Sequence, residues 1–156
     1  MSKVAIITGA GRGIGAETAR LASATGYDVC INYVSDSESA AHVVHDCEAA
    51  GRKAIAVKGD VANVADVSNL FMQYDQHFDP ITLLVKNAGI VGEATTVRDL
   101  KDDILVITSE VDVYGTVYCA REAIFRMTKS NGGTGGVIIN AYSIAARLGC
   151  PGEYVH

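Results

Sequence analysis

The sequence predicts an α/β fold, one domain over residues 1–156, in which helices cover both faces of a doubly wound parallel sheet. Short apolar runs alternate with segments of helical periodicity along the whole chain. The apolar runs are continuous, which is typical of parallel strands that are buried on both faces. Ligands of such sheets bind beyond the carboxyl ends of the strands, so the residues that follow each strand are the candidates for function.

The expected elements follow one another as strand and helix. Strands are expected over residues 3–8, 28–33, 53–57, 81–85 and 137–140. Helices are expected over residues 16–24, from a cap at Asp36 or Ser37 to Gly51, after a cap at Asn63, and over residues 102–128. The glycine-rich segment 131–136 breaks the chain before the last strand. With right-handed crossovers, this order gives a Rossmann-type sheet.

Composition narrows the class of protein. A formal net charge of −5 and the lack of a basic tail argue against nucleic acid as a partner. No apolar run reaches membrane-spanning length and no signal-peptide pattern is seen, so we expect a cytoplasmic protein without a membrane partner. The four cysteines form no Cys-x-x-Cys pair, so no metal site is expected.

A glycine-rich segment lies between the first strand and the first helix. It contains Gly9, Gly11, Arg12, Gly13, Ile14 and Gly15. Glycines let the backbone turn tightly and approach a phosphate, and the N–H groups at a helix N-terminus hold negative charge. The segment therefore predicts a dinucleotide-binding cradle. The alternative is a glycine-rich turn that binds nothing, and the flanking strand and helix argue against it.

The residues after the second strand bear on the choice of cofactor. Asn32, Tyr33 and Ser35 stand where an NAD site usually places an acid for the ribose hydroxyls, and no acid occurs before Asp36. Arg12, inside the glycine segment, offers a cation for a 2′-phosphate. Both observations favour NADP over NAD. The alternative for Arg12 is a solvated surface arginine.

Further candidates follow the remaining strands. After the third strand come Asp60 and Val61, and the Asp60 carboxylate could accept a hydrogen bond from an adenine amino group or simply form a turn. Asn87, Ala88 and Gly89 follow the fourth strand, and the small residues among them let the backbone pass close to a cofactor. Ser143 follows the fifth strand, where its hydroxyl can bind a substrate carbonyl or belong to an ordinary surface serine.

Taken together, these motifs resemble the short-chain dehydrogenase/reductase family. The stretch from Thr8 to Gly15 matches the family's TGxxxGxG motif, and Asp60 matches the Asp that contacts adenine in the family. Asn87–Gly89 matches the end of the family's NNAG motif, and residues 138–143 resemble the strand that delivers its catalytic Ser. The resemblance, nearest to glucose dehydrogenase-like and carbonyl reductase members, implies an oxidoreductase that transfers a hydride between a nicotinamide and a carbonyl or alcohol. It also implies a homodimer or homotetramer.

The departures from the family are equally specific. Lys86 replaces the first Asn of the NNAG motif, Asp112 replaces an Asn of the proton relay, and Tyr142 stands where a small residue is usual. We expect Asp112 to hold a water at a penalty from burial, and Lys86 to reach water or a carboxylate. The alternative is that all three departures are harmless drift or sequence error.

The catalytic Tyr-x-x-x-Lys motif of the family would follow His156, so the sequence corresponds to the family's N-terminal portion. We therefore expect residues 1–156 alone not to reduce carbonyls at a family-like rate. A nucleotide-binding but inactive fragment, or a truncated protein that depends on a partner, is the alternative reading.

The long expected helix carries an apolar set that suits an interface between copies. This set consists of Val113, Val117, Ala120, Ile124 and Met127, close to helical spacing. The alternative is that these residues face only the sheet.

Overall fold

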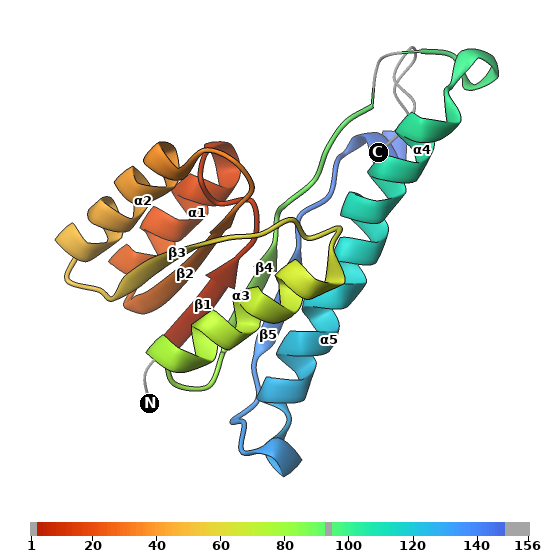
Figure 1. Ribbon diagram of the computed structural model, residues 1–156. Coiled ribbons are helices and arrows are strands. Elements are labelled where there is room, and N and C mark those ends of the chain that lie inside the picture. The colour runs from red at the N-terminus through yellow and green to blue at the C-terminus, as the bar shows by residue number, and fades with distance from the viewer. Residues whose placement is uncertain (1–2, 93–94, 149–156) are drawn as a thin grey trace.

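A parallel sheet of five strands forms the centre of the molecule. The computed structural model describes residues 3–92 and 95–148. The strands are β1 (Lys3–Ile7), β2 (Tyr27–Tyr33), β3 (Ala54–Lys58), β4 (Leu83–Lys86) and β5 (Val137–Asn140). They lie in the order β3-β2-β1-β4-β5, and every neighbouring pair is parallel. The expected α/β fold is confirmed (Figure 1).

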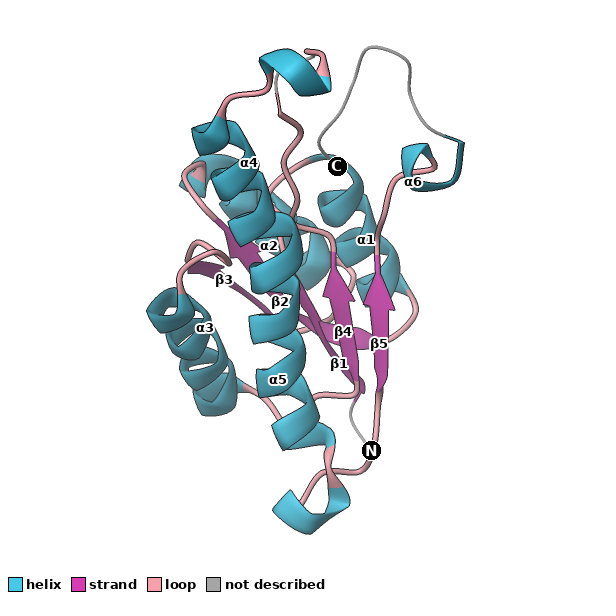
Figure 2. Cartoon of the chain, turned by 90° about the vertical axis from the view of Figure 1, so that its right-hand side faces the viewer, coloured by secondary structure: helices cyan, strands magenta, loops and turns pink. Residues whose placement is uncertain are grey.

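Helices cover both faces of this sheet. One face carries α1 (Gly13–Ala24) and α2 (Ser37–Ala49), and the other carries α3 (Val64–His77) and α5 (Thr116–Met127), as Figure 2 shows. Each face has its own apolar core, because successive strand residues point to opposite sides. In β1, Ala5 and Ile7 pack toward α1 and α2, whereas Val4 and Ile6 pack toward α3 and α5.

Two helices begin at side-chain caps that the sequence predicts. Asp36 accepts a hydrogen bond from the Ser39 N–H at the start of α2, at 2.9 Å. The Asn63 side chain accepts from the Ala65 and Asp66 N–H groups at the start of α3. Each cap satisfies N–H groups that have no partner within the helix.

The long expected helix is interrupted in its middle. It consists of α4 (Asp102–Ser109), a π-helical turn over Glu110–Gly115, and α5, so an uninterrupted α-helix over 102–128 is wrong. At Gly115 a Cβ atom would lie 2.8 Å from Val61 Cγ2 and 2.9 Å from the Val61 carbonyl oxygen. This close approach between the helix and the loop after β3 accompanies the π-helical turn, a feature that is frequent at functional sites.

The remaining elements are short. They are the 3₁₀ turns Val97–Asp99 and Lys129–Asn131 and the helix α6 (Ala145–Leu148). Within residues 3–92 and 95–148, no helix is long and apolar enough to cross a membrane.

The apolar set on the interrupted helix is divided between outside and core. Val113, Val117 and Ile124 are about half exposed, so they do not face only the sheet. Met127, in contrast, is 7% exposed and packs in the core with α3 and β4. Its assignment to an outward surface is therefore wrong, because the α5 face that carries Cys119 and Ala123 also carries Met127.

Candidate cofactor site

The candidate site lies where the strand order reverses. From β1 the chain moves to β2 and β3 on one side, and then crosses to β4 and β5 on the other. The loops after β1 and β4 therefore diverge at the carboxyl edge of the sheet, which is where open α/β sheets bind ligands. The glycine segment and Asn87–Gly89 are these two loops.

The glycine segment packs directly against the loop after β4. Gly9 has φ +62°, and a Cβ atom there would lie 2.9 Å from Ala88 Cα. At Gly15 a Cβ atom would lie 2.5 Å from Asn87 Nδ2 and 2.6 Å from the Gly9 carbonyl oxygen. Only glycine allows both approaches without a backbone shift, so these two glycines fix the shape of the cradle.

Gly13 has a different surrounding. Its φ is +57°, and a Cβ atom there would meet nothing within 4 Å. It is the first residue of α1, whose N-cap residue, Arg12, makes no side-chain capping bond. The first turn of α1 carries no acidic residue either. Open space therefore lies beside Gly13, and the uncapped N–H groups and the positive end of the α1 dipole suit the phosphates of a dinucleotide.

Thr8 joins the two loops, a role that we did not assign from the sequence. Its buried hydroxyl oxygen accepts hydrogen bonds from the Asn87 N–H at 3.1 Å and the Ala88 N–H at 3.0 Å. In return, Asn87 Nδ2 donates to the carbonyl oxygens of Thr8 and Gly9. The position of Thr8, directly before the glycines, was the available signal.

The Asn32 side chain links the glycine segment to the loop after β3 through two hydrogen bonds. It is 1% exposed; its Oδ1 accepts from the Gly9 N–H at 3.3 Å and its Nδ2 donates to the Gly59 carbonyl oxygen at 2.8 Å. The side chain thereby joins the carboxyl ends of β1, β2 and β3. Both ends of the amide are bonded to the backbone, so any role of Asn32 toward a cofactor acts through the loop that it holds.

The other residues after β2 surround an exposed region next to Arg12. Tyr33 is half-buried beside Gly11, while Arg12 and Ser35 are exposed. The pKa of Asp36 lies below its ordinary value because the Ser39 N–H and hydroxyl donate to its carboxylate, with a smaller contribution from the charge of Arg12. The carboxylate of Asp36 is therefore engaged in capping α2.

The residues after β3 form a turn. The Asp60 Oδ1 accepts from the Ala62 N–H at 2.9 Å, and the Asp60 N–H donates to Asp66 Oδ2 at 2.9 Å. The hydrogen bonds of Asp60 are thus those of a turn, which is one of the two roles expected for it. Asp60 is half-buried at the carboxyl edge of the sheet. Val61 is 5% exposed and packs in the core against Gly115, so its side chain belongs to the interior.

The candidate catalytic residues come from two separate segments. Asp112 lies on the π-helical turn, where its Oδ1 accepts from the Ile90 N–H at 3.0 Å and lies beside Gly89. Ser143 lies beyond β5, and its Oγ accepts from the Ala145 N–H at the start of α6, at 3.1 Å. No hydrogen bond joins Asp112 to Ser143 in the part of the chain that the structure describes. Tyr142 is 71% exposed.

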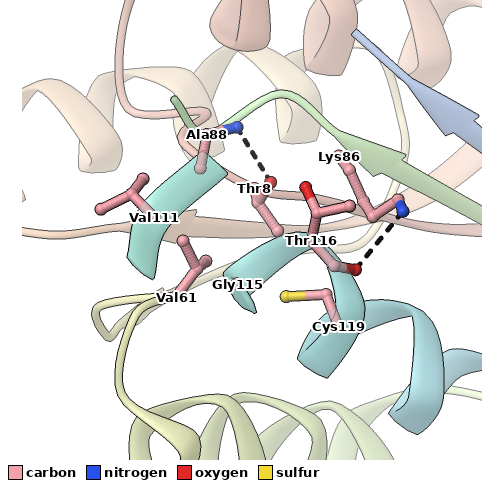
Figure 3. Close-up of a pocket in the computed structure, with 8 residues that line it drawn as sticks. All are labelled: Thr8, Val61, Lys86, Ala88, Val111, Gly115, Thr116 and Cys119. Carbon is pink, nitrogen blue, oxygen red and sulfur yellow. Dashed lines mark hydrogen bonds between the residues drawn. The ribbon is translucent and has the colours of Figure 1, made fainter. Parts of the chain in front are cut away.

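Lys86 has a partner that the sequence did not suggest. It is 8% exposed, and its Nζ donates to the carbonyl oxygen of Thr116 at 3.3 Å (Figure 3). The partner seen in the structure is thus a backbone carbonyl at the start of α5 and not the carboxylate that we expected as one possibility. Burial lowers the pKa of this amine.

The three cysteines among the described residues have the properties of unreactive thiols. Cys30, Cys47 and Cys119 are buried and unpaired, and burial raises the pKa of each thiol. Over the described residues, no group of three or more His, Cys, Asp or Glu side chains could hold a metal ion. Cys150 lies outside the described residues.

Fold and site together define a Rossmann-type protein whose candidate cofactor site lies between the loops after β1 and β4. The model of the short chain dehydrogenase family matches residues 3–155. An uncharacterized oxidoreductase of Escherichia coli, YgfF, is 41% identical over 152 residues, which are 97% of this chain and 62% of that protein. A 3-oxoacyl-[acyl-carrier-protein] reductase of Synechocystis is 36% identical over 97% of this chain and 60% of its own length.

Solved structures agree with this comparison. A variant of the Serratia marcescens short-chain dehydrogenase/reductase superposes with a TM-score of 0.85 at 30% identity, over 92% of this chain and 56% of that one. The chain belongs to the short chain dehydrogenase family. It spans about three fifths of the length of the curated relatives that it matches.

Proposed function

We propose that the chain binds a nicotinamide dinucleotide, NADP in preference to NAD, and contributes to hydride transfer between that cofactor and a carbonyl or alcohol substrate. The uncapped N-terminus of α1 at the strand reversal carries the proposal, since it offers N–H groups and open space to the cofactor phosphates. When bound, the nicotinamide ring gives or takes the hydride.

Arg12 is the residue that we assign to the choice between NADP and NAD. Arg12 is exposed, and Asp36, whose carboxylate interacts with the charge of Arg12, already caps α2. A 2′-phosphate would form charge-assisted hydrogen bonds with Arg12, as planar guanidinium groups do with phosphates. Ser35, which is also exposed, offers a hydroxyl to the same region.

Ser143 and Asp112 are assigned to the substrate side of the site. The Ser143 oxygen accepts a hydrogen bond from the Ala145 N–H, so its own proton can be donated to a substrate carbonyl oxygen. Because Asp112 uses Oδ1 for the Ile90 N–H, its Oδ2 can hold a water molecule. Both assignments place polar groups at the carboxyl edge, beyond β5 and over Gly89.

Titration of both cofactors tests the proposal. NADPH should bind more tightly than NADH by roughly 1–3 kcal/mol, the range for charge-assisted hydrogen bonds to the 2′-phosphate. Arg12→Ala should remove most of this difference and leave NADH binding unchanged. The control is Arg121→Ala, which removes an exposed arginine that lies over the Tyr118 ring. Fluorescence titration measures both affinities. Equal affinities in the parent chain, or a preference for NADH, would contradict the NADP assignment.

A further inference from the structure

Lys86 is a buried cation directly beneath the candidate site. Among the Lys, Arg, Asp and Glu side chains of the described residues, it alone is buried. Its aliphatic stem and Nζ border a small space between β4 and the start of α5, which has no room for a water molecule (Figure 3). That space is lined by Thr8, Val61, Ala88, Val111, Gly115, Thr116 and Cys119. An ammonium group in such a place must find its hydrogen bonds in the protein.

The hydrogen bond from Lys86 forms one of two anchors on the interrupted helix. Lys86 Nζ donates to the Thr116 carbonyl oxygen at the end of the π-helical turn, and Asp112 Oδ1 accepts from the Ile90 N–H near its middle. The stretch Asn87–Gly89 lies between these two anchors in the chain. The interrupted helix therefore holds this stretch at both ends.

The same stretch forms one wall of the cradle. Asn87 and Ala88 donate backbone hydrogen bonds to Thr8, and Ala88 lies against Gly9. A displacement of the end of β4 away from α5 would therefore move the wall that sets the position of Gly9. Lys86 therefore does not line the cradle itself but directly precedes the residues that do.

We propose that Lys86 is a positioning residue, which ties the start of α5 to the end of β4 and so seats Asn87–Gly89 in the conformation that binds the dinucleotide. The inference rests on the proposed cofactor site. Lys86 acts through Asn87 and Ala88, because its own Nζ is directed to Thr116. A charged donor serves this role well, since hydrogen bonds from ionised groups are stronger than neutral ones.

The arrangement gives cofactor binding a dependence on pH. Because burial lowers the pKa of Lys86, its proton is lost below the usual range for lysine, and affinity should fall as the pH rises. Of the side chains that line the space, Cys119 is the only other titratable one, and its pKa of about 12 keeps it neutral there. The carboxylate of Asp112 is on the adjoining π-helical turn, bonded to the Ile90 N–H, and Asn140 of β5, the strand partner of Lys86, does not titrate.

Two variants separate the roles of donor and charge. Lys86→Met removes both, and Lys86→Gln keeps an N–H donor without a titrating group. NADPH binding, followed by fluorescence from neutral pH to about pH 10, is the readout, with circular dichroism to verify the fold. Lys129→Met, at an exposed lysine in the 3₁₀ turn after α5, is the control.

The expected outcomes are distinct. Lys86→Met should weaken NADPH binding about tenfold at neutral pH, as the loss of about 1.4 kcal/mol does. The parent chain and Lys129→Met should lose affinity as the pH rises, whereas Lys86→Gln should bind with a flat pH profile. If the affinity of Lys86→Gln falls with rising pH as it does in the parent chain, the proposal is overturned. This test remains valid even if Lys86→Met fails to fold. A parent chain that binds no dinucleotide would instead refute the proposed function.

Discussion

At the scale of single residues, the glycines of the cradle serve two different needs. Gly9 and Gly15 are required by contact, since a Cβ atom at either would press on the Asn87–Ala88 loop or on the backbone of the glycine segment itself. Gly13 shares a positive φ with Gly9, but nothing lies within 4 Å of a Cβ atom there, so the backbone conformation (φ +57°) alone calls for glycine. The first two allow the glycine segment and the loop after β4 to pack closely, and the third leaves space beside the start of α1.

Gly13→Ala should therefore weaken cofactor binding as well as stability. The left-handed backbone makes a side chain unfavourable by about 1–2 kcal/mol, and the new methyl group would extend into the space that we assign to the phosphates. Gly51→Ala is the matched control, because Gly51 also has a positive φ of +76° and nothing within 4 Å, but lies at the end of α2. Urea unfolding should show similar losses for both variants, and NADPH titration a loss only for Gly13→Ala. Equal NADPH affinity in the two variants would argue against a phosphate at Gly13.

At the scale of elements, the contrast between helix starts separates structure from function. The caps Asp36 and Asn63 occupy the N–H groups that begin α2 and α3. The start of α1 has no such side chain. The first N–H groups of α1 therefore remain available to an external partner, in keeping with the cofactor site that we propose there, whereas those of α2 and α3 are bonded to side chains of the chain itself.

The cap on α2 should make stability depend on pH in a defined direction. The pKa of Asp36 is lower in the folded chain, so its carboxylate stabilises the fold above the unfolded pKa, and this contribution is lost as the pH falls through the folded pKa. Asp36→Ala should lower the unfolding temperature at neutral pH, and the difference from the parent should shrink in acid. Glu48→Ala, at an exposed carboxylate in the last turn of α2, is the control, and thermal unfolding over a pH series is the measurement. A difference that stays constant into acid would show that Asp36 acts by some means other than its charge.

The sequence predicted the elements better than the bonds between them. Continuous apolar runs and cap residues locate the strands, α2 and α3, because these signals are local along the chain. The hydrogen-bond partner of Lys86 is 30 residues away in the sequence, and the two partners of Asn32 are 23 and 27 residues away. No local pattern in the sequence encodes such distant pairs. The π-helical turn likewise accompanies a close approach of Gly115 to Val61, which lie far apart in the sequence.

At the scale of the whole molecule, exposed apolar side chains gather in at least two regions of the described residues. Along the interrupted helix, the exposed set consists of Leu105, Val106, Ile107, Val113, Tyr114, Val117, Ile124 and Phe125. At the sheet edge, Val137 and Ile139 of β5 are about half exposed. Exposed apolar areas of this kind mark surfaces that associate with other protein segments.

We expect the interrupted helix to form an interface between copies of the chain. Its exposed residues recur at helical spacing, so an antiparallel or parallel pairing of two such helices would bury them together, and a stable interface needs about 1,200–2,000 Å² in total. Val117→Glu, in the middle of this face, should shift the protein to monomers in light scattering at micromolar concentration. Val97→Glu places the same charge on a valine that is 77% exposed in the 3₁₀ turn before α4, and should leave the mass unchanged. A monomeric parent chain would refute the interface, and loss of assembly in both variants would assign it to another surface.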